Sequence, residues 1–207
     1  MRLSGTVSSG DPPSRTITQL KGTRRHIATA GVLLLVGSVV LNVLLARKVR
    51  STGASSHVLQ VGVNVPPITA TRTDGKIETI AYSSSDRPTV LYIFTPTCSW
   101  CERNMDNIKA LIHLKDAEYR FIGLSLSGEG LSSYVRAHGL ALPTYSELPQ
   151  DLLQVYKLHG TPQTIVVSPE GRVIQNWMGA YVGNQKSQVE AFFHVSLPGI
   201  RRAQNSH

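Results

Sequence analysis

A pair of closely spaced cysteines is the sequence feature that most limits how this chain can fold. Cys98 and Cys101 are the only cysteines among 207 residues. Residues 89–94, Thr-Val-Leu-Tyr-Ile-Phe, come just before them and predict a buried strand. After them, Met105 and Ile108 continue one face of a helix that includes Cys101. The pair is therefore expected where a core strand passes into a helix, with Cys98 at the helix N-terminus.

This position favours redox chemistry. Free backbone N–H groups and the helix dipole at an N-terminus stabilise an anion, and the thiolate is the reactive form of cysteine. A structural zinc site needs about four ligands, and the seven histidines show no matching spacing. Covalent haem attachment needs a histidine where Glu102 stands. A purely structural disulfide remains an alternative, although a two-residue loop constrains the unfolded chain little.

The net charge of +8 lies almost entirely in the first 50 residues. Residues 1–50 contain eight Lys and Arg and one acidic residue, whereas residues 51–207 contain thirteen and twelve. The basic residues flank an apolar segment, which is typical of membrane topology and not of a phosphate-binding face. No nucleic-acid partner is expected.

Residues 27–46 predict a transmembrane helix. They carry no charge, and twenty helical residues span about 30 Å. A cleaved signal peptide is disfavoured because its apolar part is usually about 7–15 residues long and ends in a small-residue site, whereas Arg47 follows directly here. The flanking charges are balanced locally, and Arg2 and Arg15 tip them slightly toward an inside N-terminus.

The remaining segments complete the predicted domain organisation. Residues 1–26 predict a disordered, basic cytoplasmic tail, and residues 47–57 a linker. Residues 58–196 predict the folded domain, and residues 197–207 a flexible tail.

Within the domain, strands and helices are expected to alternate. The predicted strands are residues 68–73 and 76–80 around an Asp-Gly turn, 89–94, 119–126, and a second hairpin of 163–167 and 172–177. The predicted helices run from the cysteine pair to about His113, from 131 to 138, from 151 to 158 and from 185 to 195. This order predicts an α/β fold with a mixed β-sheet covered by helices on both faces and preceded by one transmembrane helix.

Several motifs in this framework match a known family. They are Phe94 to Cys101 (FTPTCSWC), Leu142-Pro143, Tyr156 to Thr164 (YKLHGTPQT), Glu170 to Val173 (EGRV) and Gly179-Ala180, after Gly62 to Pro66 and the Asp74-Gly75 turn. Over residues 58–196 the chain resembles the thioredoxin superfamily, in particular its membrane-anchored TlpA/ResA-like branch. The resemblance implies a thioredoxin-like fold and a thiol–disulfide oxidoreductase.

The resemblance also implies roles for five residues. Cys98 would be the nucleophile that forms a mixed disulfide with a substrate, and Cys101 would resolve it. Pro162 matches the family's cis-proline beside the dithiol, and Thr161 would offer backbone groups to an extended substrate segment. Trp100 would either face the substrate or cover the thiols. Neither a metal nor an organic cofactor is expected.

The sequence departs from the family at two acidic positions. Typical thioredoxins carry a buried acid where Tyr92 stands, and cytochrome-maturation relatives carry one where Asn104 stands. Glu102 is closer in sequence, but its place on the helix is expected to point it elsewhere. Neither family acid is therefore present to move protons for Cys101.

We expect a membrane-tethered thiol–disulfide oxidoreductase that acts as a reductase, since no histidine between the cysteines stabilises the thiolate. Its partners would be protein disulfide or dithiol substrates and an upstream electron donor in the membrane or outside the cytoplasm. The expected location is the inner (cytoplasmic) membrane, single-pass, with the catalytic domain periplasmic, where disulfides persist.

Two other functions stay open. A thiol-dependent peroxidase would have both a threonine and a proline before its cysteine; Thr95 is present, but Leu91 replaces the proline. A Cu(I)-delivery protein would use Cys98, Cys101 and a distant histidine.

Overall fold

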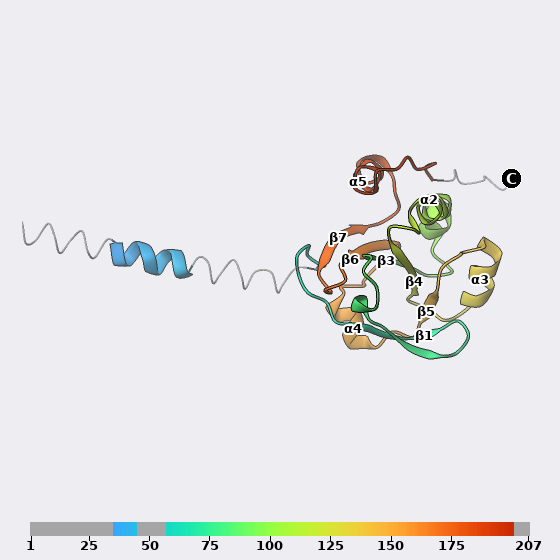
Figure 1. The fold of residues 1–207 in the computed structure, drawn as a ribbon, viewed down its shortest axis with the longest axis horizontal. Helices are drawn as coiled ribbons and strands as arrows, with labels where there is room; N and C mark the ends of the chain where they lie inside the picture. The colour runs from blue at the N-terminus through green and yellow to red at the C-terminus, as the bar shows by residue number, and fades with distance from the viewer. Residues whose placement is uncertain (1–34, 45–56, 201–207) are drawn as a thin grey trace, which may run out of the picture. The chain divides into compact units, whose positions relative to one another are not determined.

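The computed structural model describes residues 35–44 and 57–200, and the chain divides into two units, Met1–Ser55 and Ser56–His207 (Figure 1). In the first unit, residues 35–44 are helical. No helix within the described residues is both long and apolar enough to cross a membrane. The predicted tail 1–26, nearly all of the linker 47–57 and half of the predicted transmembrane segment 27–46 lie outside the described residues.

The second unit alternates strands and helices, as predicted. Its elements are β1 (Ile68–Arg72), β2 (Ile77–Ile80), a 3-10 helix (Tyr82–Ser84), β3 (Thr89–Phe94), α2 (Ser99–Lys115), β4 (Arg120–Ser125), α3 (Leu131–His138), β5 (Thr144–Ser146), α4 (Gln150–Val155), β6 (Gln163–Val167), β7 (Val173–Met178) and α5 (Gly183–Phe193).

The strands form one mixed sheet of seven, in the order β2-β1-β5-β4-β3-β6-β7. Strand β3 lies inside the sheet, parallel to β4 and antiparallel to β6. Every residue of β3 is buried, as its apolar composition predicts. The two predicted hairpins are present as the antiparallel pairs β1–β2 and β6–β7.

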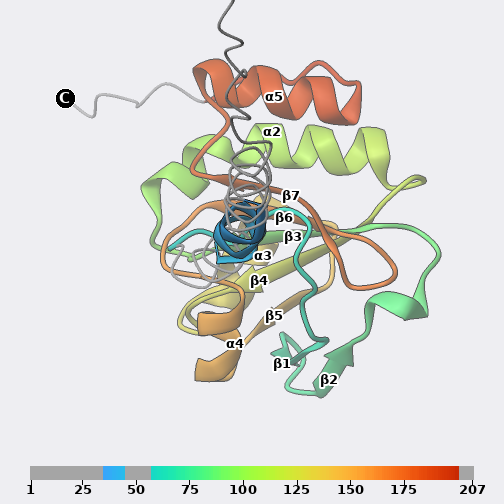
Figure 2. The ribbon, with the colours of Figure 1, turned by 90° about the vertical axis from the view of Figure 1, so that its left-hand side faces the viewer.

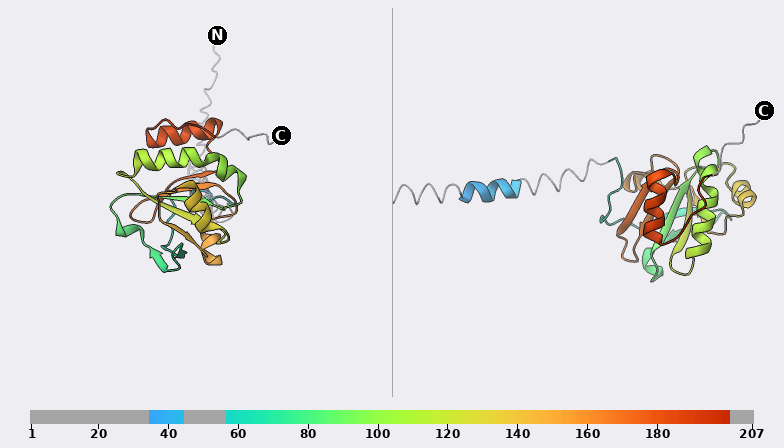
Figure 3. Two further views of the ribbon diagram at one scale, coloured as in Figure 1. Left: turned by 90° about the vertical axis from the view of Figure 1, so that its right-hand side faces the viewer. Right: turned by 90° about the horizontal axis from the view of Figure 1, so that it is seen from above.

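Helices cover both faces of this sheet (Figures 2 and 3). Helices α2, α3 and α5 contribute to one buried cluster, and α4 contributes to the cluster on the opposite face. Successive residues of a strand point to opposite faces, so Val90, Tyr92 and Phe94 join the α2 cluster while Leu91 and Ile93 join the other. The predicted thioredoxin-like arrangement is confirmed for this unit.

Some element boundaries differ from the predicted ones. Strand β5 was not predicted, because three residues are too few to show a period. Helix α4 ends at Val155, since Lys157 adopts a left-handed backbone conformation with φ 53°. Contacts with the domain continue to Gly199, whose N–H donates to Asn107 Oδ1, and Leu197 is buried.

Candidate active site

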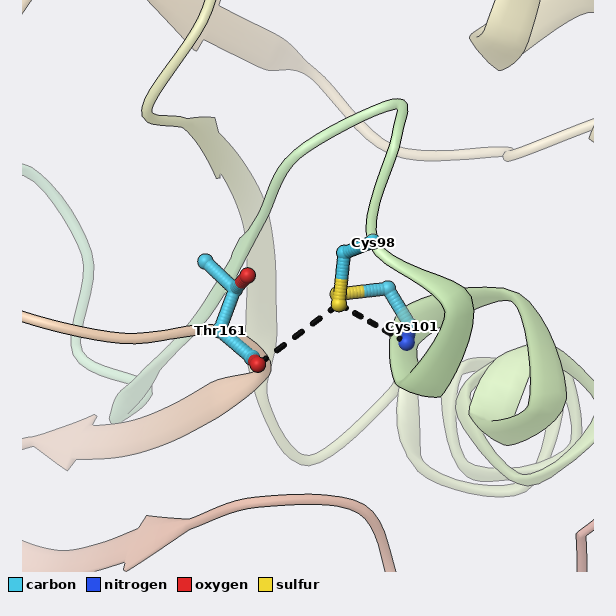
Figure 4. The surroundings of a disulfide bond; sticks show 3 residues. All are labelled: Cys98, Cys101 and Thr161. Atoms are coloured by element: carbon cyan, nitrogen blue, oxygen red, sulfur yellow. Dashed lines mark hydrogen bonds between the residues drawn. A yellow bond between two sulfur atoms is a disulfide. The ribbon is translucent and has the colours of Figure 1, made fainter.

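The turn between β3 and α2 presents the first cysteine at the end of a helix. Cys98 is the N-cap of α2, and its own N–H donates to the Thr95 carbonyl oxygen. The Cys101 N–H donates to Cys98 Sγ over 3.1 Å (Figure 4). N-cap positions usually carry an oxygen side chain that accepts such a bond. Here a sulfur accepts it, so the helix end directs a backbone donor at the predicted nucleophile.

The two cysteines differ in exposure. They form a disulfide with Cα atoms 5.2 Å apart. Cys98 is partly exposed, whereas Cys101 is completely buried among the residues under α2. An incoming substrate therefore has access to Cys98 and not to Cys101, as the predicted roles of nucleophile and resolving thiol require.

A loop distant in sequence completes the site. The Thr161–Pro162 peptide bond is cis, as the family motif predicts. Figure 4 shows Thr161 facing the disulfide, with its carbonyl oxygen 3.5 Å from Cys98 Sγ. The Gly179 N–H donates to the Pro162 carbonyl oxygen over 2.7 Å, which ties this loop to the end of β7. The structure thus brings Thr161 and Pro162 to the dithiol.

Two exposed apolar side chains lie at the ends of the elements that carry this site. Trp100, in the first turn of α2, is 46 % exposed, with the Arg103 guanidinium 4.3 Å from its ring centroid. This exposure favours a substrate-facing role over that of a cover. Met178, at the end of β7, is 38 % exposed, and a Cβ on Gly160 would lie 3.8 Å from its methyl group. Sequence reasoning missed Met178, because only strand pairing places it beside the Thr161 loop.

The positions of the two missing acids are buried. Asn104 is completely buried, and its Oδ1 accepts hydrogen bonds from the Tyr181 N–H and Asn107 Nδ2. Tyr92 is 2 % exposed, and burial raises its pKa well above its ordinary value. Glu102 contacts His138 of α3, with its Oε2 2.9 Å from Nε2. Neither sequence position of the family acids therefore supplies a carboxylate.

The copper alternative would use both cysteines together with a distant histidine. Within residues 35–44 and 57–200, no group of three or more His, Cys, Asp and Glu side chains could hold a metal ion.

A sulfur capping a helix opposite a cis-proline loop, at one end of a mixed sheet, is the arrangement of thioredoxin-like proteins, so the fold and the site define this class. The model of the AhpC/TSA family matches residues 61–176, more than half of the chain, and the chain belongs to that family. A comparison with curated protein sequences gave no match.

Solved structures agree with this class. The thioredoxin domain of a thiol-disulfide oxidoreductase from Bacteroides vulgatus is 21 % identical, with a TM-score of 0.54, over 65 % of this chain and 99 % of that one. A thiol-disulfide isomerase from Corynebacterium glutamicum is 17 % identical, with a TM-score of 0.53, over 66 % and 96 %. A secreted disulfide oxidoreductase from Mycobacterium tuberculosis is 16 % identical, with a TM-score of 0.51, over 61 % and 93 %. These solved structures share the thioredoxin-like fold that the sequence predicts.

Proposed function

We propose that this chain is a membrane-tethered thiol–disulfide oxidoreductase that reduces disulfides in protein substrates through Cys98 and Cys101. The observation that carries the proposal is the position of Cys98 Sγ. It lies between the Cys101 N–H and the Thr161 carbonyl oxygen, on the accessible side of a dithiol whose second sulfur is buried.

The reaction follows from this geometry. The reduced Cys98 thiolate attacks a substrate disulfide and forms a mixed disulfide, while one substrate sulfur leaves as a thiolate. Cys101 then attacks Cys98 Sγ, which releases the second substrate sulfur and leaves Cys98 and Cys101 joined. Beside the loop of Thr161, an extended substrate segment can pair with the backbone, and Trp100 offers it an apolar surface.

Two observations favour the reductive direction. A strongly oxidising dithiol needs strong stabilisation of its reduced form, and the residues between the cysteines, Ser99 and Trp100, carry no positive charge. Among the described residues, the hydrogen bond that Cys98 Sγ accepts comes from a neutral backbone N–H, that of Cys101. A reductase must be re-reduced after each turnover, so a dithiol carrier in the membrane or outside the cytoplasm is the proposed electron donor.

The proposed tether is the segment 27–46, with an inside N-terminus and a periplasmic domain. Its lack of charge supports this, as do the exposed apolar side chains of the helical residues 35–44. The one amide there, Asn42 Nδ2, donates to the Ser38 carbonyl oxygen over 2.8 Å, so this polar group is partly satisfied within its own helix. A hydrogen bond of this kind lowers the cost of an amide in hydrocarbon.

The test is a disulfide-reduction assay with the full-length protein. It should accelerate the reduction of insulin disulfides by dithiothreitol, and Cys98→Ser should abolish the acceleration. Peroxide consumption and Cu(I) binding are measured in parallel on the same preparation. Rapid peroxide consumption without insulin reduction would show that the protein is a peroxidase and would contradict the proposal. Tight Cu(I) binding without insulin reduction would favour a metal-delivery function instead.

A further inference from the structure

Three buried polar groups on the α2 side of the sheet have no hydrogen-bond partner among the described residues. They are Tyr92 Oη, Asn104 Nδ2 and Tyr134 Oη. Buried polar groups in folded proteins are nearly always paired, and an unpaired one needs an explanation such as a catalytic role or an ordered water. For Tyr92 and Asn104, the position near one cysteine supplies such an explanation.

Two of these groups belong to the surroundings of Cys101. Asn104 follows Cys101 by three residues on α2, so both side chains lie on one face of the helix, and both are completely buried. Tyr92 projects from β3 into the same buried cluster as Cys101. The pKa of Tyr92 is raised by burial, then by Tyr181 and Tyr134, and is lowered by the Asn104 side chain. The hydroxyl of Tyr92 and the amide of Asn104 are therefore neighbours.

The hydrogen bonds of Asn104 fix which of its atoms is free. Oδ1 accepts from the Tyr181 N–H at 3.0 Å and from Asn107 Nδ2 at 2.9 Å. A backbone N–H can only donate, so the atom facing Tyr181 must be the oxygen. Among the described residues the remaining Nδ2 faces the Tyr92 hydroxyl but has no partner in normal hydrogen-bond geometry, so it is an available donor. Tyr92 keeps its proton at ordinary pH, because burial disfavours its anion, and is a second donor.

We propose that the Tyr92 hydroxyl and the Asn104 amide stabilise the Cys101 thiolate in the resolving step, directly or through an ordered water. This inference rests on the proposed function. Cys101 loses its proton to water, its electron pair forms a bond to Cys98 Sγ, and the bond between Cys98 and the substrate sulfur breaks. The substrate leaves as a thiolate and takes a proton from water. The substrate is reduced and the protein dithiol is oxidised, so no further reactant is needed.

Donation by neutral groups has a specific consequence for the pH profile of this step. Hydrogen bonds to the charged form lower the pKa of an acid, and removal of a donor must therefore raise the pKa of Cys101. Tyr92 and Asn104 add no ionisation of their own near neutral pH. The other titratable groups around the cluster are Cys98 at the N-cap of α2, Glu102 of α2, Tyr119 after α2, Tyr134 and His138 of α3, and Tyr181 after β7.

The experiment titrates Cys101 in the full-length protein carrying Cys98→Ser, so that one thiol remains. Thiolate absorbance and the alkylation rate are followed against pH. Adding Tyr92→Phe removes only the hydroxyl and should lower the thiolate fraction at neutral pH about tenfold, since a hydrogen bond to a charged group has about this effect. Asn104→Asp keeps an oxygen that can accept from the Tyr181 N–H, but replaces the amide NH2 group by a second carboxyl oxygen. It should also lower the thiolate fraction of Cys101 at neutral pH.

Tyr82→Phe is the matched control. It removes a buried hydroxyl that pairs with Tyr156 Oη in the cluster on the opposite face of the sheet, so it should leave the Cys101 titration unchanged. Unchanged titrations in both Tyr92→Phe and Asn104→Asp, with circular dichroism showing folded proteins, would overturn the proposal. If Tyr92→Phe does not fold, an unchanged titration in Asn104→Asp still overturns the proposal, and a shift supports it only if Asn104→Leu, which removes the amide without adding a charge, shifts the titration in the same direction. Insulin reduction by the wild-type chain is scored separately, so that failure of the oxidoreductase function is distinguished from failure of the donor role.

Discussion

The chemistry of the site depends on a difference between two cysteines that are one helical turn apart. Cys98 receives a backbone N–H from the first turn of α2 and is partly exposed, whereas Cys101 is enclosed beneath the helix. The helix end lowers the pKa of a thiol placed like Cys98 below the ordinary value of about 8.5. Limited alkylation of the reduced protein near neutral pH should therefore label Cys98 before Cys101, as mass spectrometry of the peptides would show.

The same difference predicts which cysteine variant traps substrates. Cys101→Ser keeps the nucleophile but lacks the thiol that releases it, so mixed disulfides should accumulate on Cys98. Cys98→Ser should trap few partners, because the remaining thiol is buried. Both variants are compared in cells after an acid quench, by non-reducing electrophoresis. More trapped partners with Cys98→Ser than with Cys101→Ser would reverse the assigned roles.

Trp100 gives a second prediction for single residues. Its ring is nearly half exposed in the turn that carries the dithiol, so its loss should weaken substrate binding without unfolding the domain. Trp100→Ala should raise KM for a protein disulfide several-fold and change the melting temperature little, because exposed substitutions usually change stability by less than about 0.5 kcal/mol. Leu114→Ala is the control, since Leu114 is 50 % exposed near the other end of α2. Equal KM values for the two variants would remove Trp100 from the substrate site.

At the scale of helices and strands, buried tyrosines connect elements that are separate in sequence on both faces of the sheet. The hydroxyl of Tyr82 in the 3-10 helix is hydrogen-bonded to the hydroxyl of Tyr156 after α4, and the hydroxyl of Tyr181 to that of Thr164 in β6. Burial raises the pKa of all three tyrosines above the ordinary value. On the α2 face, burial raises the pKa of Tyr134 to about 12.

These shifts predict loss of stability at alkaline pH. Each of these tyrosines has a higher pKa in the folded protein than in the unfolded chain, where it is about 10. Below pH 10 both states keep the proton, so the contribution to the free energy of unfolding is complete. Above pH 10 the unfolded chain loses the proton first, so this contribution falls as the pH rises. The free energy of unfolding from urea titrations should therefore be flat between about pH 7 and 9 and fall above pH 10. Tyr134→Phe should reduce the alkaline slope. A slope unchanged in that variant would contradict the contribution assigned to Tyr134.

The elements that could be predicted from the sequence are those with a strong local pattern. Residues 89–94 are uniformly apolar and form β3 with the predicted bounds, and residues 131–138 form α3, closed by Gly139 in a left-handed conformation with φ 55°. Strand β5 has three residues and exists only because β1 and β4 pair with it. Short strands of this kind depend on partners distant in sequence, so local patterns do not reveal them.

The features of the candidate site also divide into those that short motifs predict and those that depend on packing. Cys98, Cys101 and the cis bond before Pro162 follow from short motifs, whereas the exposure of Met178 beside Gly160 follows from strand pairing. The contact of Glu102 with His138 joins two helices whose relative position no local pattern determines. Predictability therefore ends where a contact depends on the packing of separate elements.

At the scale of the whole molecule, the uneven distribution of charge and the use of cysteine bear on where the domain works. The basic excess flanks residues 27–46, and the sequence contains no cysteine besides the dithiol pair. A chain outside the cytoplasm gains from having no spare thiol, because disulfides form and persist there. The proposed single-pass topology therefore exposes the domain of residues 58–196 on the periplasmic side, which a protease can test.

Protease added to cells with a permeabilised outer layer should degrade this domain and leave a short membrane-bound fragment, detected through an epitope at the N-terminus. The epitope itself should survive, because the N-terminus is proposed to lie inside. A cytoplasmic protein measured in the same samples must remain intact, as a control for the inner membrane. If the domain is protected until the inner membrane is broken, the proposed orientation is wrong, and the dithiol would instead work in the reducing cytoplasm.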